Sequence, residues 1–466
     1  MIEQTKSYKG AFATVTSLFF MWGFITVMND VLINTFEGIF NLTAFKTSMI
    51  QMCFFGAFFI ISLIYFIISS TTGKDPINRI GYRNGMSISL LICGIGCLAF
   101  FPAAYSNSYY VFLLALFILA AGVTLLQICA NPYAALLGKP ETASSRLNFA
   151  QGLNSLGTTI GPLIGVLLIF RIFSNGEATV ESVGKTYLIY GGIFVLFAIL
   201  VRFTKLPSFI NEDKIVPGFS VLKHRHLLFG IFAIFFYVGA EVSIGSWLVK
   251  LLQAPKIAGF EKETANYFLS YYWGGLMIGR LLGTISLGEK TKLKKYLGMA
   301  ITSLLVFGFI YFITSIKNEG GNFHMEYLSF SNISLFMVFL SINYIGFILG
   351  WSLASRSLAV FSFICIALLL LVTLGQGEIS LWSAISLGLF NSIMWSNIFT
   401  LAIKDLGKLT SQGSSLLVMA IVGGAVIPPL QSLVIDNYGV QISYLVPIVS
   451  YIYLAFYGLF GYKQKA

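Results

Sequence analysis

The sequence predicts an all-α membrane protein with about 14 transmembrane helices. Of its 466 residues, 57% are hydrophobic and only 10% are charged, whereas a soluble domain carries about 25% charged residues. The apolar residues form runs that reach the roughly 20 residues a spanning helix needs. The five cysteines all fall inside these runs, with no disulfide or metal-ligand spacing. This pattern excludes a soluble globular protein, a disordered chain and a nucleic-acid binder.

Fourteen apolar runs are long enough to span a bilayer, and most connections between them are short. The longest connection, 204–226, contains two prolines and several charges. It predicts a linker between a six-helix bundle at 1–203 and a second bundle at 227–466. The predicted spans are 12–36, 47–70, 85–104, 109–137, 147–170, 186–203, 227–249, 265–288, 296–315, 331–350, 356–374, 380–403, 413–434 and 441–462.

The lysines and arginines predict the orientation of these spans. If the N-terminus is cytoplasmic, 22 of the 29 basic residues fall on the cytoplasmic side and seven on the outer side. Arg280 is counted here with the cytoplasmic residues that follow it. An excess of Lys and Arg marks cytoplasmic loops, so we expect both termini in the cytoplasm. The net charge of +11 therefore reads as a topology signal rather than as a site for an acidic partner.

The two halves of the chain repeat each other, as in many transporters. Asp30 aligns with Glu241 at an offset of 211, with phenylalanine and valine matches around them. Later spans match at an offset of 266, in the pairs Asn131/Asn397, Ser145/Ser411, Gly157/Gly423 and Pro162/Pro428. The offsets differ by 55 residues, the length of two spans with loops. The sequence thus predicts a helix pair inserted at about 296–350.

Asp30 and Glu241 are acidic residues inside predicted spans. A charge at the bilayer centre costs about 2.5–3.5 kcal/mol on insertion scales. The assignment places no Lys or Arg deep in a span to pair with them, so we expect both carboxyls to face a wet cavity and to act in ion coupling. The alternative is a protonated acid that neighbouring helices satisfy.

Ten further side chains are predicted to bind the substrate. Amides donate and accept hydrogen bonds, which suits the hydroxyls of a sugar, and tryptophans can stack on its C–H face. The alternatives are hydrogen bonds between helices and packing or interfacial roles. As a set these residues favour a neutral polyol over an ion or a lipid. They are Asn29, Gln127, Asn131, Gln151, Asn154, Asn391, Gln431, Trp22, Trp273 and Trp395. No motif for catalysis, a metal or a bound cofactor is present in the sequence.

Several motifs resemble known transporters. Residues 78–83, Asn-Arg-Ile-Gly-Tyr-Arg, resemble a degenerate form of the loop motif of the major facilitator superfamily. Within that superfamily the chain resembles the fucose–galactose–glucose:proton symporter family, outside about 296–350. The segments that carry this resemblance are 19–24, 29–30, 126–133, 137–142, 145–148, 237–241, 388–394, 412–414 and 423–428.

The resemblance implies a major facilitator fold and sugar uptake across the bacterial inner membrane by alternating access. It implies that Asp30 carries the coupling role. The fucose branch has a second acid where this chain has Gln127, whereas Glu241 is typical of glucose/galactose-like members. A hexose is therefore the first choice, ahead of N-acetylglucosamine, mannose and L-fucose. Because some relatives use sodium, the co-transported ion is a proton or sodium.

Two other classes fit the sequence less well. A membrane glycosyltransferase or ligase would carry a large outer loop with clustered carboxylates, but the longest outer gaps have only about 15 residues. A sugar sensor would carry a soluble output domain, and the sequence has none. We therefore expect a non-enzymatic, monomeric carrier whose partners are a monosaccharide, a coupling cation and the lipid bilayer.

Overall fold

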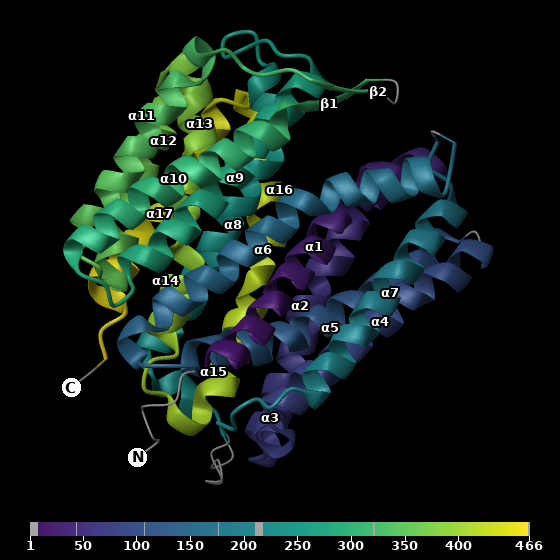
Figure 1. Cartoon of the computed structure of the whole chain (residues 1–466), viewed down its shortest axis with the longest axis vertical. Helices are drawn as coiled ribbons and strands as arrows, with labels where there is room; N and C mark the ends of the chain where they lie inside the picture. The colour runs from purple at the N-terminus through teal and green to yellow at the C-terminus, as the bar shows by residue number, and fades with distance from the viewer. Residues whose placement is uncertain are drawn as a thin grey trace. The chain divides into compact units, whose positions relative to one another are not determined.

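The computed structural model describes residues 8–42, 44–106, 108–175, 177–209, 218–319 and 322–464. These residues are almost entirely α-helical (Figure 1). The helices are α1 (Lys9–Phe40), α2 (Ala44–Thr72), α3 (Pro76–Ile80), α4 (Tyr82–Ser106), α5 (Tyr109–Leu136), α6 (Ala143–Leu167), α7 (Val180–Phe203), α8 (Arg225–Gln253), α9 (Lys262–Ser286), α10 (Lys292–Ser315), α11 (Phe330–Leu349), α12 (Ala354–Leu374), α13 (Gly377–Asn391), α14 (Met394–Ala402), α15 (Thr410–Met419), α16 (Gly423–Tyr438) and α17 (Val446–Phe456).

All fourteen predicted spans lie on helices. Within the described residues, 13 helical stretches are long and apolar enough to cross a membrane. The remaining predicted span, 265–288, corresponds to α9, which has 25 residues but carries Arg280 and several serine, tyrosine and glycine residues. The prediction of an all-α membrane protein is therefore confirmed.

Two of the predicted spans are interrupted. The run 380–403 forms α13 and α14, which are separated at Ser392 and Ile393. The run 413–434 forms parts of α15 and α16, with a 3-10 turn at Ala420–Val422 between them. Apolar composition predicts that a segment crosses the membrane, but it does not predict where the helical hydrogen bonding is interrupted.

A β-hairpin follows α10, where the sequence predicted only a connection. The strands β1 (Ile316–Glu319) and β2 (Asn322–Met325) pair antiparallel, with Ile316 opposite Met325. The hairpin leads into α11, whose first turn is capped by the Ser329 side chain.

The chain divides into two compact units. Unit 1 comprises residues 1–143, 156–223 and 403–422, and unit 2 comprises 144–155, 224–402 and 423–466. Helix α6 passes from unit 2 to unit 1 after Ser155, and the chain returns to unit 2 after Val422. With the repeat offset of 266, these two crossings fall at nearly equivalent positions in the two halves. The division proposed from the sequence, with a linker at 204–226 that includes residues outside the described ranges, stays a prediction.

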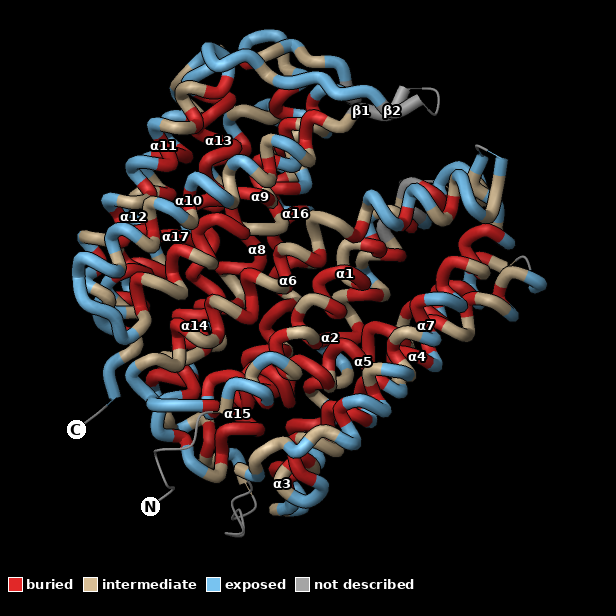
Figure 2. Tube along the Cα trace, viewed as in Figure 1, coloured by how far each residue is buried: buried red, intermediate tan, exposed pale blue. Residues whose placement is uncertain are grey.

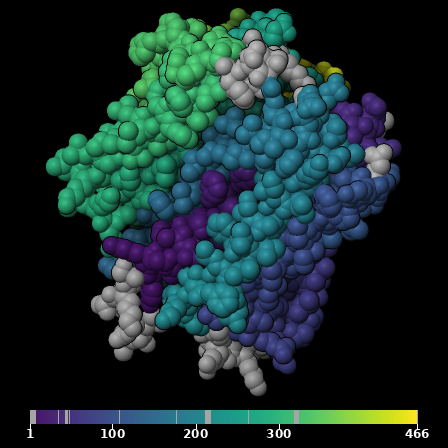
Figure 3. Space-filling model, turned by 45° about the vertical axis from the view of Figure 1, so that its right-hand side comes forward, coloured from purple at the N-terminus to yellow at the C-terminus, as the bar shows by residue number. Residues whose placement is uncertain are grey.

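The packing inside each unit follows the predicted repeat. In unit 1, α4 packs on α5 and α7, and in unit 2, α12 packs on α13 and α17. Helix α12 is thus the counterpart of α4. Helices α10 and α11 instead pack on the outside of α9 and α13. Their outward sides are exposed (Figure 2), and the green segment to which they belong lies on the surface in Figure 3. This position is the one expected of an inserted pair.

One pair of matched glycines packs against equivalent helices in the two units. A Cβ on Gly157 of α6 would fall 2.3 Å from the carbonyl oxygen of Phe20 on α1, and a Cβ on Gly423 of α16 would collide with the carbonyl oxygen of Phe235 on α8. Glycine therefore permits the close approach of equivalent helices in each half.

Candidate functional site

Glu241 lies on α8 within unit 2 and is held by two neighbouring groups. The Tyr237 hydroxyl, one turn earlier, donates a hydrogen bond to Glu241 Oε1 at 2.7 Å. Arg280 Nη2 on α9 lies 3.7 Å from the same oxygen; Arg280 is buried and Glu241 is partly buried. Among the described residues these contacts use Oε1 and leave Oε2 without a protein partner.

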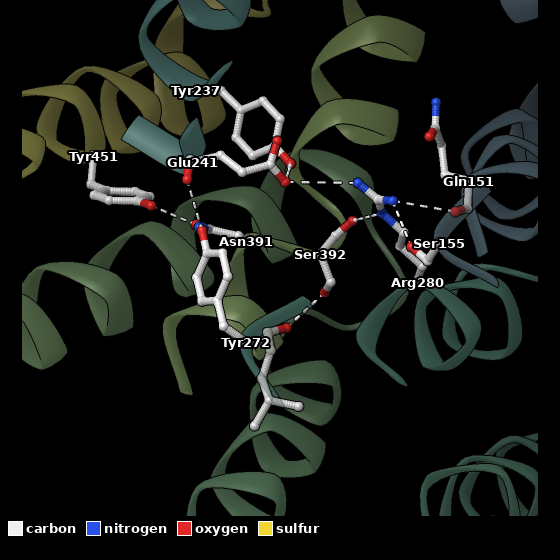
Figure 4. A network of polar contacts seen from close by, with 10 residues as sticks. Gln151, Ser155, Tyr237, Glu241, Tyr272, Arg280, Asn391, Ser392 and Tyr451 are labelled. Carbon is white, nitrogen blue, oxygen red and sulfur yellow. Dashed lines mark hydrogen bonds and ion pairs between the residues drawn. The ribbon is translucent and has the colours of Figure 1, made fainter. Parts of the chain in front are cut away.

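Arg280 corrects an expectation from the sequence. We expected no basic residue deep in a span and counted Arg280 on the cytoplasmic side, but it lies buried inside α9. Its Nη1 donates to Ser155 Oγ at 2.6 Å and to the Gln151 carbonyl at 3.3 Å, both on α6 (Figure 4). The predicted absence of a cationic partner for Glu241 is therefore wrong. A guanidinium can be buried here because its donors are matched by acceptors on several helices.

The break between α13 and α14 supplies another acceptor. Arg280 Nε donates to the Ser392 carbonyl at 3.3 Å. Ser392 is the C-cap of α13, so its carbonyl lies at a helix end, where carbonyls lack their usual N–H partners. The guanidinium thus joins α6, α8, α9 and the α13–α14 break.

Asn391 belongs to the same network through Tyr272 (Figure 4). Its Nδ2 donates to the Tyr272 hydroxyl at 3.1 Å, and that hydroxyl donates to the Glu241 carbonyl at 3.0 Å. The Tyr451 hydroxyl donates to Asn391 Oδ1 at 2.5 Å. Glu241 and Asn391, predicted from different arguments, are therefore brought together by tyrosines that the sequence analysis did not single out.

The other predicted residues of unit 2 surround this network to different degrees. Gln151 provides its backbone carbonyl, and its side chain extends away from Arg280 (Figure 4). Asn154 is buried on the next turn of α6. Trp273 follows Tyr272 and packs against Gly245 of α8. Trp395 is buried on α14, where its Nε1 has no hydrogen-bond partner among the described residues.

The Gln431 side chain is hydrogen-bonded to residues outside this network. Ser243 of α8 donates to its Oε1, and its Nε2 donates to Ser443 Oγ at 3.0 Å. With its side chain fully buried, this amide joins α16 to α8 and to the turn Ile442–Leu445. Its contacts are those of the alternative considered above, a hydrogen bond between helices.

Unit 1 holds the first acid. Asp30 lies inside α1 with an exposed side chain, whereas its neighbour Asn29 and the more distant Trp22 are buried. An exposed carboxylate inside an apolar helix must face water or polar groups rather than hydrocarbon. Since Asp30 and Glu241 belong to different units, their convergence on one cavity stays a prediction.

Two amides of α5 lie one turn apart in unit 1. Asn131 is fully buried, and neither its Oδ1 nor its Nδ2 has a hydrogen-bond partner among the described residues. Gln127 is also largely buried. Because most buried polar groups in proteins are satisfied, the unpaired amide of Asn131 is a candidate contact for a polar substrate.

The loop motif at 78–83 is organised by a residue just before it. Asp75 caps α3 by accepting from the Asn78 backbone at 3.0 Å, and it accepts a hydrogen bond from the Tyr65 hydroxyl at 2.8 Å. Burial raises the pKa of this carboxyl above its ordinary value, although these hydrogen bonds lower it. No cluster of three or more histidine, cysteine or acidic side chains suited to a metal occurs among the residues described.

Comparison with known proteins agrees with this arrangement. The model of the Major Facilitator Superfamily matches residues 10–350. The chain belongs to the major facilitator superfamily. The structure of the outward-conformation transporter FucP is similar over 99% of this chain and 100% of its own length, with a TM-score of 0.75 and 27% identity.

Curated relatives narrow the family. A protein of Brucella abortus (strain 2308) named glucose/galactose transporter is 38% identical over 98% of this chain and 96% of its own length. The L-fucose-proton symporter of Escherichia coli (strain K12) is 27% identical over 96% of this chain and 92% of its own. This member of the superfamily thus falls within the fucose–galactose–glucose symporter group that its motifs resemble.

Proposed function

We propose that this transporter is an ion-coupled symporter of a neutral monosaccharide, of the glucose/galactose type. The observation that carries the proposal is the 38% identity, over nearly the whole length of both chains, to the Brucella abortus glucose/galactose transporter. Such similarity extends over both units. The sugar crosses the membrane without chemical conversion, so the function is transport rather than catalysis.

The polar groups of unit 2 suit a neutral substrate. The charge of Glu241 is balanced by Arg280, so no uncompensated charge in this cluster selects an ion. Glu241 Oε2 and the Gln151 side chain supply groups for sugar hydroxyls, while Trp273 supplies an aromatic face. Unit 1 has buried amides of its own, Asn131 and Gln127.

Asp30 is the group to which we assign ion coupling. It is an exposed acidic residue inside an apolar helix. A proton or a sodium ion can neutralise such a carboxylate before it is desolvated. Coupling requires that the ion and the sugar favour the same conformational state.

The transporter is proposed to act as a monomer in the bacterial cytoplasmic membrane, with both termini in the cytoplasm. The bias of 22 basic residues to seven supports this orientation. Reporter fusions after residue 322 and at the C-terminus test it. The fusion at 322 should report the outer side and the C-terminal fusion the cytoplasm; the reverse result would contradict the assignment.

Uptake into proteoliposomes tests the function. Radiolabelled glucose, galactose, mannose, N-acetylglucosamine and L-fucose are offered under an imposed pH gradient or an imposed sodium gradient, with protein-free liposomes as the control. We expect accumulation of glucose or galactose with one of the gradients. Background uptake of the whole panel would contradict sugar symport, and accumulation of L-fucose alone would favour the second candidate, which the Escherichia coli relative suggests.

A further inference from the structure

The carbonyl oxygen of Leu389 lies just before the break between α13 and α14. It accepts a hydrogen bond from Asn343 Nδ2 at 2.9 Å and another from Ser392 Oγ at 2.7 Å. These side chains take the place of the backbone N–H that an uninterrupted helix would supply. Both donors thus satisfy a carbonyl that the interruption leaves without its helical N–H partner.

Asn343 belongs to α11, one of the two inserted helices. This helix is otherwise strongly apolar, with exposed Val338, Ile342 and Ile345. The Asn343 side chain is fully buried within unit 2, and its Oδ1 has no hydrogen-bond partner among the described residues. A polar side chain that faces the interior from a lipid-facing helix suggests a specific role.

The opposite side of the break is fixed by α9. A Cβ on Gly279 would fall 2.6 Å from the Leu389 carbonyl oxygen and would also collide with Ser392. Helix α9 is thus in direct backbone contact with the break. The residue after Gly279 is Arg280, whose Nε binds the Ser392 carbonyl. The break lies between α9, which carries the guanidinium, and α11, which carries Asn343.

We propose that Asn343 is a positioning residue of the transporter. Through its hydrogen bond to the Leu389 carbonyl, the inserted helix pair fixes the backbone at the α13–α14 break. By holding the Leu389 carbonyl, Asn343 fixes the Ser392 carbonyl that binds Arg280 and the Asn391 amide that binds Tyr272. Its effect on sugar affinity rests on the proposed function. The inserted pair is then a part of the site's support rather than a lipid-facing addition alone.

Sugar exchange tests whether Asn343 positions the α13–α14 break. Asn343→Leu replaces the amide with an apolar side chain of similar size and removes the donor, whereas Asn343→Ser keeps a hydroxyl donor. We expect Asn343→Leu to raise the KM for the transported sugar about tenfold, and Asn343→Ser to raise it less. Ser341→Ala is the matched control, because Ser341 is exposed on α11 and bonds only to its own helix; its KM should be unchanged.

A double-mutant cycle distinguishes positioning from general damage. Combined with Arg280→Lys, Asn343→Leu should add little further loss in exchange, because both changes act through the same network. Ser341→Ala should combine additively with Arg280→Lys. If the losses of Asn343→Leu and Arg280→Lys simply multiply, or if Asn343→Leu leaves KM unchanged, Asn343 does not act through this network.

A second measurement does not depend on sugar. Cys365 Sγ lies 3.8 Å from Asn391 Oδ1 and is fully buried, so its alkylation by a membrane-permeant maleimide reports opening near the break. In Asn343→Leu we expect Cys365 to react several times faster, while buried Cys93 and Cys97 of unit 1 keep their rates. Equal acceleration of all these thiols, or none, would overturn the proposal. Absence of uptake by the wild type would refute the proposed function but leave this result decisive for Asn343.

Discussion

Arg280 Nη2 lies 3.7 Å from Glu241 Oε1, and both side chains are largely shielded from solvent in unit 2. The pair joins α8 to α9, and the remaining donors of Arg280 extend it to α6 and to the α13–α14 break. A buried ion pair of this kind is costly to desolvate, but it is far more costly to leave one partner without the other. The effects of substituting Arg280 and Glu241 on stability should therefore be coupled.

Substitution of one or both partners tests this dependence. Arg280→Met leaves the Glu241 carboxyl in a buried site without its cation, which costs about 3–5 kcal/mol of folding free energy. The double variant Arg280→Met/Glu241→Gln removes the stranded charge, so its thermal unfolding temperature in detergent should lie above that of Arg280→Met. A double variant no more stable than the single one would show that the pair is not energetically coupled.

Gln431 and Asn131 should respond to substitution in opposite ways. Both are fully buried amides that the sequence assigns to the substrate, but Gln431 is bonded to Ser243 and Ser443, whereas Asn131 has no protein partner among the described residues. Gln431→Leu strands those hydroxyls and should cost about 1–3 kcal/mol of stability, with little change in the KM of the folded protein.

Asn131→Leu should instead preserve or raise the unfolding temperature, because it removes an unsatisfied amide. Its KM for sugar should rise if that amide binds a hydroxyl. Thermal unfolding and exchange kinetics measured on both variants give the comparison. An Asn131→Leu variant with normal KM would remove Asn131 from the substrate site.

The apolar runs predicted the helices well because bilayer thickness sets their length, and the offset of 266 correctly paired Gly157 with Gly423. Arg280 was misplaced because the basic residues that follow it gave a consistent loop count. Its partner Glu241 is on another helix, and no spacing within α9 reveals that contact. The roles of Tyr272 and Asn343 were equally out of reach, since they depend on a break in α13–α14 that composition does not encode.

Asp75 predicts a pH dependence of stability. Burial raises the pKa of this carboxyl above its ordinary value of 3.8, so the folded state favours the protonated form. This contribution to stability is present at low pH and is lost as pH rises through the ordinary value towards the raised one. Asp75→Asn stays neutral and can still cap α3. The wild type should therefore lose stability relative to Asp75→Asn as pH rises.

Unfolding temperatures recorded from about pH 4 to about pH 7 check this prediction. Asp75→Ala is the control, because it loses the cap and should be less stable than Asp75→Asn by about 1 kcal/mol at every pH. A constant difference between the wild type and Asp75→Asn would show that the carboxyl does not titrate in this range.

We expect a substitution at Asp30 to separate ion coupling from sugar exchange. In the proposed mechanism, the carboxylate meets water in one conformational state, and desolvation penalises its charged form in the other. Asp30→Asn mimics the neutral acid and removes this penalty in every state, so ion binding can no longer favour one state of the carrier. The variant should fail to concentrate sugar against a gradient but should still exchange labelled for unlabelled sugar.

Glu37→Gln, which changes an exposed acid near the end of the same helix, is the matched control and should accumulate sugar normally. Both assays are run in proteoliposomes under the gradient that drives the wild type. Accumulation by Asp30→Asn equal to that of the wild type would show that another group carries the ion.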